Sequence, residues 1–203
     1  MLYGIDISNW QSGLKPSMIQ KNSKKDRIDF CICKATEGTV FVDKWCDSFI
    51  QDCIENNILF GFYHFASHDD PRKEAEFFFD NCRGYIGKGI PVLDYEVDNA
   101  NNAQWCEKFM RRFHDLAGVW PILYISASRC SQYGASWIPN KCGLWVAGYP
   151  YTMSSWTYDE MPYDISPWDD AAIWQFTSQL ILQGYVGKLD GDAPYWLQRE
   201  ALI

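Results

Sequence analysis

Short runs of hydrophobic residues alternate along this chain with longer stretches in which hydrophobic residues recur at helical spacing. A short run that is apolar throughout is typical of a strand buried on both faces, and helical stretches between such runs are typical of parallel α/β folds. Because eight such runs occur, we expect a closed α/β barrel rather than an open sheet. The predicted strands are Leu2–Ser8, Phe30–Ala35, Leu59–Phe65, Ile90–Glu96, Pro121–Ser126, Leu144–Tyr149, Ala172–Phe176 and Tyr185–Leu189.

Three of the intervening stretches predict amphipathic helices. The first spans Lys44–Asn57, the second begins at Pro71, where a proline fits the first helical turn, and the third spans Asn102–Ala117. Gly118 directly follows the third helix and provides its expected end. The stretch Pro150–Asp170 contains three prolines and no helical period, so it predicts a long surface loop.

The composition indicates a folded domain with an acidic balance of charge. With 203 residues, 47% of them hydrophobic, a large core can form, and no linker or repeat divides residues 1–203 into more than one domain. The net charge of −8 and the lack of a basic stripe argue against nucleic-acid binding. No apolar run is long enough for membrane insertion, and we expect a monomer. Ten tryptophans exceed what a core needs, and aromatic faces suit the flat apolar faces of sugar rings.

The cysteines and histidines do not predict a metal site. Cys-x-x-Cys spacing is absent from the eight cysteines, and His64 and His68 fall on a strand and in the loop beyond it rather than on one helix face. Cys31 and Cys33 share one face of a predicted strand. We expect mostly buried free thiols, with one or two disulfides still open, and neither a metal nor a cofactor.

Asp94 and Glu96 stand at the end of an apolar strand and are separated by one residue. Side chains alternate between the two faces of a strand, so both carboxylates are expected to point the same way. Two carboxylates at close range cannot both ionise freely, and one is pushed to keep its proton at neutral pH. A protonated carboxylic acid beside an ionised partner is what glycosidic bond cleavage requires. The local pattern also fits a solvated acidic loop or an ion pair, so the other strand ends have to decide.

The active site of an α/β barrel lies at the carboxyl ends of its strands. Four carboxylates, Asp6, Asp94, Glu96 and Asp190, are expected to converge there from the first, fourth and last strands, which favours a site over acids scattered outside the barrel. The polar residues at the predicted strand ends are Asp6, Ser8, Lys34, Thr36, Glu37, Tyr63, His64, Asp94, Glu96, Tyr124, Ser126, Tyr149, Gln175, Thr177 and Asp190. A serine hydrolase is excluded by the lack of a Gly-x-Ser-x-Gly elbow, and a phosphate-binding loop by the glycine spacing around Lys34.

Several motifs resemble, in order, those of the family 25 glycoside hydrolases, the lysozymes also called N-acetylmuramidases. The resemblance covers almost the whole chain. The motifs are Gly4-Ile5-Asp6-Ile7-Ser8-Asn9-Trp10-Gln11, Lys34-Ala35-Thr36-Glu37-Gly38-Thr39, Gly61-Phe62-Tyr63-His64-Phe65, Asp94-Tyr95-Glu96, Leu144-Trp145-Val146-Ala147, Trp174-Gln175-Phe176-Thr177-Ser178 and the acidic turn at Asp190.

The resemblance implies a flattened, irregular (β/α)8 TIM-like barrel that hydrolyses the β-1,4 bond between N-acetylmuramic acid and N-acetylglucosamine in bacterial peptidoglycan. It implies that Glu96 is the general acid and that Asp94 assists the N-acetyl group of the substrate, which acts as the nucleophile. Asp6 and Asp190 complete the acidic cluster and help to keep Glu96 protonated. The expected sugar contacts are Tyr63, Tyr124, Trp174, Gln175 and Lys34.

The closing turn departs from the family pattern. In Leu189-Asp190-Gly191-Asp192 either aspartate could occupy the family's position, and Asp190 is preferred. Two other functions stay open: a catalytically inactive carbohydrate-binding domain on the same barrel, and a chitinase-like hydrolase. Chitinases, however, carry a longer run of acids than Ile90–Glu96 provides.

The expected place of action is the bacterial cell wall. No secretory signal precedes the first predicted strand, since Met1-Leu2 lead directly into it. The protein is therefore expected to leave the cytosol through a phage holin-type route, as an endolysin does, or to be an already trimmed form.

Overall fold

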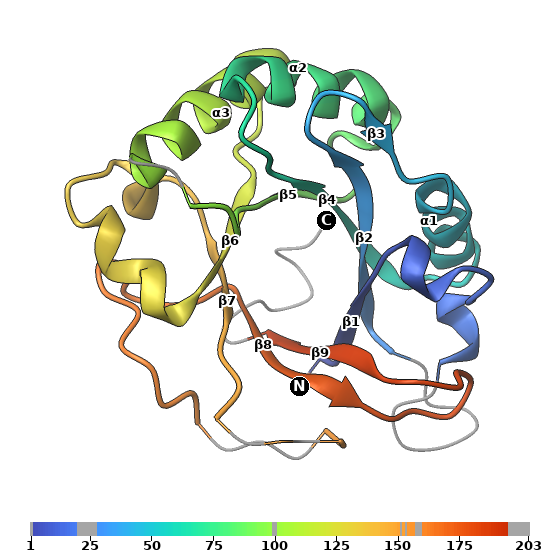
Figure 1. Ribbon diagram of the computed structural model, residues 1–203. Coiled ribbons are helices and arrows are strands. Elements are labelled where there is room, and N and C mark those ends of the chain that lie inside the picture. The colour runs from blue at the N-terminus through green and yellow to red at the C-terminus, as the bar shows by residue number, and fades with distance from the viewer. Residues whose placement is uncertain are drawn as a thin grey trace.

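The computed structural model describes residues 2–19, 28–98, 101–150, 152, 154–156 and 160–194, and these form a closed barrel. The described strands are β1 (Gly4–Ile7), β2 (Phe30–Glu37), β3 (Phe41–Val42), β4 (Leu59–Phe65), β5 (Ile90–Asp94), β6 (Ile122–Ser126), β7 (Leu144–Ala147), β8 (Ile173–Leu180) and β9 (Leu189–Pro194). All except β3 belong to the barrel, which closes because β1 pairs with both β2 and β9. Figure 1 shows these strands encircling a common axis, with the helices outside them. The predicted α/β barrel is confirmed.

Strand direction changes only at the end of the barrel. The pairings from β1 through β2, β4, β5, β6 and β7 to β8 are all parallel. β9 runs antiparallel to both of its neighbours, β8 and β1. The amino-terminal end of β9 therefore lies beside the carboxyl ends of the other strands, so its first residues can reach the same end of the barrel.

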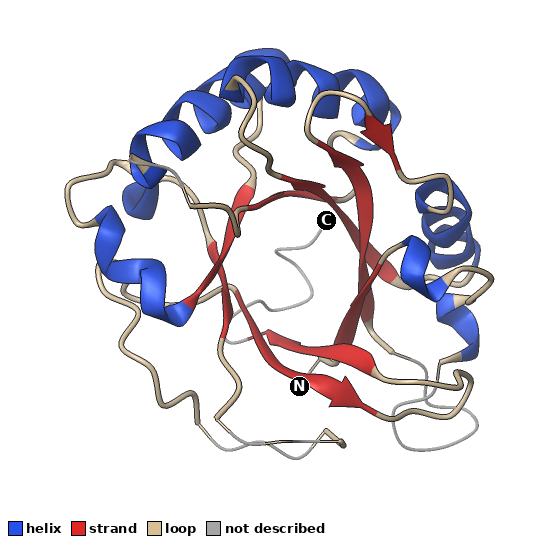
Figure 2. Ribbon diagram, in the orientation of Figure 1, coloured by secondary structure: helices blue, strands red, loops and turns tan. Residues whose placement is uncertain are grey.

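Three α-helices of the described chain cover part of the barrel. They are α1 (Cys46–Glu55), α2 (Pro71–Cys82) and α3 (Asn102–Ala117). Helix α2 begins with a cap in which the Asp70 carboxylate accepts hydrogen bonds from the backbone N–H groups of Arg72 and Lys73. Helix α3 ends at Gly118, whose φ of 73° allows its N–H to bond to the His114 carbonyl. Figure 2 shows helices at the left, top and right of the barrel and the hairpin of β8 and β9 along the bottom, where no helix covers the strands drawn, which gives the barrel its irregular outline.

Two hydrophobic clusters hold these layers together. One lies between the strands and the helices, and α3 contributes a buried stripe to it that includes Trp105, Phe109 and Phe113. The other fills the inside of the barrel: Phe30, Ile32, Tyr63, Val92, Tyr124, Trp145, Ala172 and Ile173. Because side chains alternate along each strand, neighbours within a strand, such as Leu93 and Val92, belong to different clusters.

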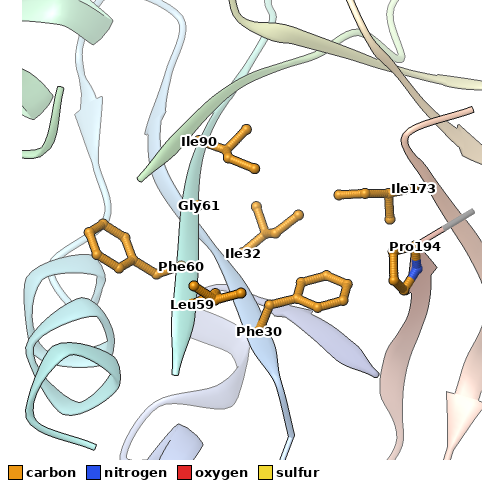
Figure 3. A pocket seen from close by; sticks show the side chains of 8 residues that line it. All are labelled: Phe30, Ile32, Leu59, Phe60, Gly61, Ile90, Ile173 and Pro194. Carbon is orange, nitrogen blue, oxygen red and sulfur yellow. The ribbon is translucent and has the colours of Figure 1, made fainter. Parts of the chain in front are cut away.

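The floor of the barrel is closed by apolar side chains. They come from the first residues of β2, β4, β5 and β8 and from Pro194 at the end of β9, and they surround a void of about 10 Å³ (Figure 3). A void of this size has room for at most about one water molecule, and its apolar lining offers no hydrogen bonds. In the described part of the chain, the polar cavity of the barrel opens at the opposite end.

Most of the predicted elements lie where the sequence places them, but the last predicted strand is wrong. Instead of Tyr185–Leu189, the final strand is β9, Leu189–Pro194. Residues 185–188 belong to the connection from β8, in which Gly184 and Gly187 have positive φ angles and Val186 is fully exposed. Within the predicted loop Pro150–Asp170, the described residues form neither helix nor strand, while residues 151, 153 and 157–159 lie outside the described part.

All eight cysteines are buried free thiols. This agrees with the expectation of mostly buried thiols and leaves no disulfide among them. Cys31 and Cys33 lie on one face of β2 with their sulfur atoms 3.7 Å apart, and burial raises the pKa of both. Among the described residues, no helix combines the length and the apolar character needed to cross a bilayer.

Candidate active site

A polar cavity of about 340 Å³ opens at the carboxyl ends of the parallel strands, opposite the apolar floor. The four carboxylates that the sequence singles out all line it: Asp6, Asp94, Glu96 and Asp190. Its other lining residues include Lys34, Tyr63, Tyr124 and Gln175, four of the five expected sugar contacts. With Trp145 of β7 also in the lining, every strand of the barrel contributes a residue to the cavity.

Asp94 and Glu96 project from the end of β5 into this cavity. Asp94 is the last residue of the strand, and its carbonyl accepts a hydrogen bond of 2.9 Å from the Ala66 N–H. Between the two acids, Tyr95 is fully buried on the opposite face and its N–H bonds to the Tyr124 carbonyl at 3.0 Å. This backbone anchoring directs both carboxylates to the same side, as the alternation along the strand predicts.

Both acids hold protons more tightly than free carboxyls. Burial raises the pKa of Asp94 well above its usual value, and the negative charge of Glu96 raises it further. Burial also raises the pKa of Glu96, while the positive charges of Arg129 and Lys34 act in the opposite direction. The two carboxyls are therefore suited to sharing their charge, with one protonated beside one ionised.

One oxygen of Asp94 has no hydrogen-bond partner among the described residues. Its Oδ1 atom is buried and accepts no hydrogen bond from any side chain or backbone group of the described residues. Buried carboxylate oxygens in folded proteins are nearly always paired. An acceptor held ready on the cavity wall beside Glu96 is suited to a donor group of a ligand.

Asp6 anchors a hydrogen-bond network on the adjoining wall. The Gln175 side chain donates from Nε2 to Asp6 Oδ2 at 2.7 Å, and its Oε1 atom accepts from Tyr124 Oη at 2.8 Å and also from the Tyr149 hydroxyl. The amide nitrogen of Gln175 donates one hydrogen bond and its oxygen accepts two, so the orientation of the side chain is fixed. Burial, followed by the charge of Asp190, raises the pKa of Asp6.

The structure separates the two aspartates of the closing turn. Asp190 lies opposite Asp6 in the register of β1 and β9 and lines the cavity. Burial, followed by the charge of Glu96, raises the pKa of Asp190 from 3.8 to about 6. Asp192 is one layer deeper, fully buried, and is not part of the cavity lining. Asp190 is thus the aspartate in contact with the open space of the site.

Lys34 and Tyr63 lie next to the acids. The Lys34 ammonium donates to Glu37 Oε2 at 2.6 Å and lies 4.6 Å from the centre of the Phe65 ring. Tyr63 is 9% exposed, and burial raises the pKa of its hydroxyl. Tyr63 lies on β4, which is adjacent to β5, and Lys34 lies on β2, the next strand along. Both therefore supply hydrogen-bond donors close to the carboxylates.

Trp174 is a correction to the predicted set of sugar contacts. It is 1% exposed, packs against Phe176 in the cluster outside the barrel, and donates from its indole N–H to the Gly148 carbonyl at 2.9 Å. Its neighbour Gln175 points inward, and adjacent strand residues point to opposite faces. Trp174 and Gln175 therefore cannot both face the cavity, and Trp174 belongs to the core.

Trp10 is a cavity residue to which the sequence interpretation gave no role. Its side chain is 84% exposed at the cavity mouth. Its backbone is nevertheless fixed, because Ser8 Oγ accepts a hydrogen bond from the Trp10 N–H and the Asn9 N–H donates to Asp43 at 2.7 Å. An exposed indole on an anchored turn is a ready platform for a sugar ring. The position of Trp10 directly after strand β1 is the sequence feature that could have predicted its place at the cavity mouth.

A second cavity, of about 330 Å³, adjoins the first on the side of β6. Glu96, Tyr124 and Tyr149 line both cavities, so they form the boundary between the two. Arg129 lines the second cavity and binds the chain just beyond Glu96, donating to the Val97 carbonyl at 2.9 Å and pairing with Asp98 at 3.0 Å. Together the two cavities form a groove with Glu96 at its middle. No sequence motif indicates that Arg129 lines this groove.

His64 is a structural residue that faces away from the cavity. It is fully buried between Thr36 Oγ1 and Glu74 Oε2, each 2.8 Å from one of its ring nitrogens. Burial lowers its pKa. The contact between His64 and Glu74 links β4 to α2. Within the described part of the chain, no group of three or more His, Cys, Asp or Glu side chains is arranged to hold a metal ion.

Comparison with known proteins identifies relatives over most of the chain. The family model described as "Glycosyl hydrolases family 25" matches residues 5–185. The chain is 25% identical to Lysozyme M1 of Streptomyces globisporus, an alignment that covers 93% of this chain and 65% of that protein. It is 29% identical to the N,O-diacetylmuramidase of Chalaropsis sp, over 62% of this chain and 66% of that protein. The chain thus spans just under two thirds of the length of these curated relatives.

Solved structures share the same barrel. A bacterial lysozyme from Streptomyces coelicolor aligns with a TM-score of 0.79 at 23% identity, over 99% of this chain and 94% of that one. A family GH25 lysozyme from Aspergillus fumigatus gives 0.76 at 25% identity, over 98% and 96%. The catalytic domain of an endolysin from a Listeria monocytogenes bacteriophage gives 0.72 at 23% identity, over 96% and 93%.

Proposed function

Because the chain belongs to the glycosyl hydrolases of family 25, we propose that it is a lysozyme that hydrolyses the β-1,4 bond between N-acetylmuramic acid and N-acetylglucosamine in peptidoglycan. The observation that carries this proposal is the pair at the end of β5. There, the buried Asp94 Oδ1, which has no protein donor among the described residues, lies on the cavity wall with the protonatable Glu96. An acetamido N–H is a donor that this acceptor can take.

In the proposed reaction, the carbonyl oxygen of the substrate's own acetamido group attacks C1 of the N-acetylmuramic acid unit. The bond from C1 to the leaving oxygen breaks, and Glu96 transfers its proton to that oxygen. Asp94 accepts a hydrogen bond from the acetamido N–H and stabilises the positive charge that develops on the cyclic intermediate. Water then adds to C1, Glu96 takes a proton from the water, and the acetamido group is released unchanged.

The remaining residues of the groove position the sugars and tune the acids. Glu96 separates the two adjoining cavities, so sugar units on either side of the cleaved bond have a place in the groove. Asp6 and Asp190 supply negative charge that favours protonated neighbours. Trp10 offers an exposed face for stacking at the mouth. All these groups come from one chain, which supports action as a monomer.

We propose that the place of action is the bacterial cell wall. Peptidoglycan is found there, and the family contains lysozymes. The net charge of −8 provides no attraction to an anionic wall, so affinity has to come from contacts in the groove.

The release of reducing ends from purified peptidoglycan tests this function. Wild type is expected to release them, and Glu96→Gln is expected to lose about 100-fold or more of the rate, because the amide cannot donate the proton. Glu55→Gln, at an exposed position of α1, is the matched control and should retain the rate. Binding of wild type to the wall without turnover would instead favour a carbohydrate-binding domain, and turnover of chitin oligomers alone would favour a chitinase-like enzyme.

A further inference from the structure

A fifth carboxyl group lies beneath the four that line the cavity. Asp192 on β9 points into the barrel, as Asp190 does two residues earlier, and its side chain has no exposed surface. In the strand register it lies beside Gly4 of β1 and Gln175 of β8, one layer below Asp6. The proposed reaction does not use Asp192, although burying a carboxyl group without a function or a partner is costly.

The two oxygens of Asp192 are in different situations. Oδ1 accepts a hydrogen bond of 2.9 Å from the Trp145 indole N–H. Oδ2 is buried and receives no hydrogen bond from an N–H or O–H donor of the described residues. Asp6 and Asp192 are diagonal neighbours on the paired strands β1 and β9, and Gln175, which lies beside Asp192 in the register, bonds to Asp6. A hydrogen bond between two carboxyl groups forms only when one of them carries a proton. The pair therefore needs a shared proton.

We propose that Asp192 is a positioning residue that retains this proton and donates it in a hydrogen bond to Asp6, so that Asp6 stays ionised and fixed beneath the reacting sugar. The proposal rests on the proposed function of the cavity. Asp192 acts by holding Asp6 in place and does not itself contact the substrate.

The surroundings favour the proton on Asp192 rather than on Asp6. Asp6 Oδ2 already accepts a bond from Gln175 at 2.7 Å, which stabilises its ionised form, and Asp6 retains 9% exposure to the cavity. Among the described residues, the donor to Asp192 is the neutral indole of Trp145. Burial and the negative charge of Asp6 both raise the pKa of Asp192. Among the described residues, Asp190 on the same strand and Tyr149 also couple to Asp192 through their charges, and neither supplies a positive charge.

An ionised Asp6 has two effects on the site. It holds the Gln175 amide, which in turn orients the hydroxyls of Tyr124 and Tyr149 on the boundary between the two cavities. Its charge also raises the pKa of Asp94. Without the proton on Asp192, two buried negative charges would face each other and this arrangement would not persist.

Infrared spectroscopy of the whole chain at neutral pH tests the proposal without substrate. The difference spectrum between wild type and Asp192→Asn is expected to show one buried protonated carboxyl group in wild type that the variant lacks. If that difference contains an ionised carboxylate instead, the proposal is overturned. Because no substrate is present, this result is independent of whether the chain cleaves peptidoglycan.

Kinetics on peptidoglycan then test the positioning role. Asp192→Asn keeps an acceptor for Trp145 and a neutral N–H donor for Asp6, so it is expected to retain kcat/KM within about threefold and the pH profile of wild type. Asp192→Leu keeps the branching at Cγ, with larger methyl groups, but removes the donor, and is expected to lose about tenfold or more, mainly in kcat. Equal losses in the two variants, or a shifted pH profile in Asp192→Asn, would contradict the proposal. The comparison of wild type with Asp192→Asn remains decisive if the leucine variant fails to fold.

Discussion

Asp6 and Asp190 lie directly opposite each other in the pairing of β1 with β9, although they come from the two ends of the sequence. The antiparallel direction of β9 makes this possible, because it places the start of the last strand at the carboxyl end of the first. Asp190 thus joins a cavity whose other acids come from parallel strands. The resulting concentration of negative charge in a partly buried space has consequences that can be measured.

Stability should respond to pH through Asp190. Its pKa is raised from 3.8 to about 6, so the folded chain binds this proton more tightly than the unfolded chain does. Its contribution to stability is therefore fully present below about pH 4 and is lost as the pH rises through about 6. Asp190→Asn, which carries no charge, is expected to gain about 1–3 kcal/mol in the free energy of unfolding relative to wild type between about pH 4 and pH 8.

Urea denaturation of wild type and Asp190→Asn at both pH values measures this gain. Asp115→Asn, an exposed position on α3, is the matched control. If the difference between wild type and Asp190→Asn is the same at both pH values, the raised pKa of Asp190 is not supported.

Lys34 should set the alkaline limit of activity. Its ammonium group lowers the pKa of both Asp94 and Glu96, while burial raises them. In Lys34→Met both acids are expected to keep their protons to higher pH, so the alkaline limb of kcat/KM against pH should move upward. Lys44→Met, at an exposed position, serves as the control. A limb that stays in place or moves to lower pH would show that Lys34 does not act on the acids.

Trp10 should contribute to binding but not to folding. Because its side chain is 84% exposed, Trp10→Ala is expected to leave the free energy of unfolding unchanged. Loss of the stacking surface should raise KM for peptidoglycan about three- to tenfold with little change in kcat. Steady-state kinetics at several wall concentrations measure this, and an unchanged KM would remove Trp10 from the groove's contacts.

Trp174 should behave in the opposite way. It is buried in the core outside the barrel and its indole N–H is bonded to Gly148. Trp174→Ala is expected to cost about 3–5 kcal/mol of stability, because it leaves a large cavity in the core. Thermal or urea denaturation measures the loss. A stable variant with a raised KM would restore Trp174 as a sugar contact.

The sequence predicts the site residues more accurately on strands that are buried on both faces than on the last strand of the barrel. The apolar run before Asp94 defines β5, and alternation along it correctly places Asp94 and Glu96 on one side. The same alternation argues against pairing Trp174 with Gln175 as cavity residues, which the motif resemblance had grouped together. Local pattern was the better indicator in this case.

The last strand could not be predicted from hydrophobic pattern. β9 contains Gly191, Asp192 and Pro194, residues that weaken a strand prediction, and it is stabilised by pairing with both β8 and β1. That pairing depends on closure of the barrel, which brings together segments far apart in sequence. For the same reason, the diagonal placement of Asp6 and Asp192 on paired strands follows only from the register of the folded chain.

Under the proposed function, the barrel cleaves peptidoglycan on the reducing side of N-acetylmuramic acid. Digestion of peptidoglycan of defined composition, followed by reduction and mass analysis of the released muropeptides, tests it most directly. Wild type is expected to release fragments whose reduced terminal sugar is N-acetylmuramic acid, and the Glu96→Gln digest is expected to lack them. Fragments that end in reduced N-acetylglucosamine, or equal digestion by wild type and Glu96→Gln, would contradict it.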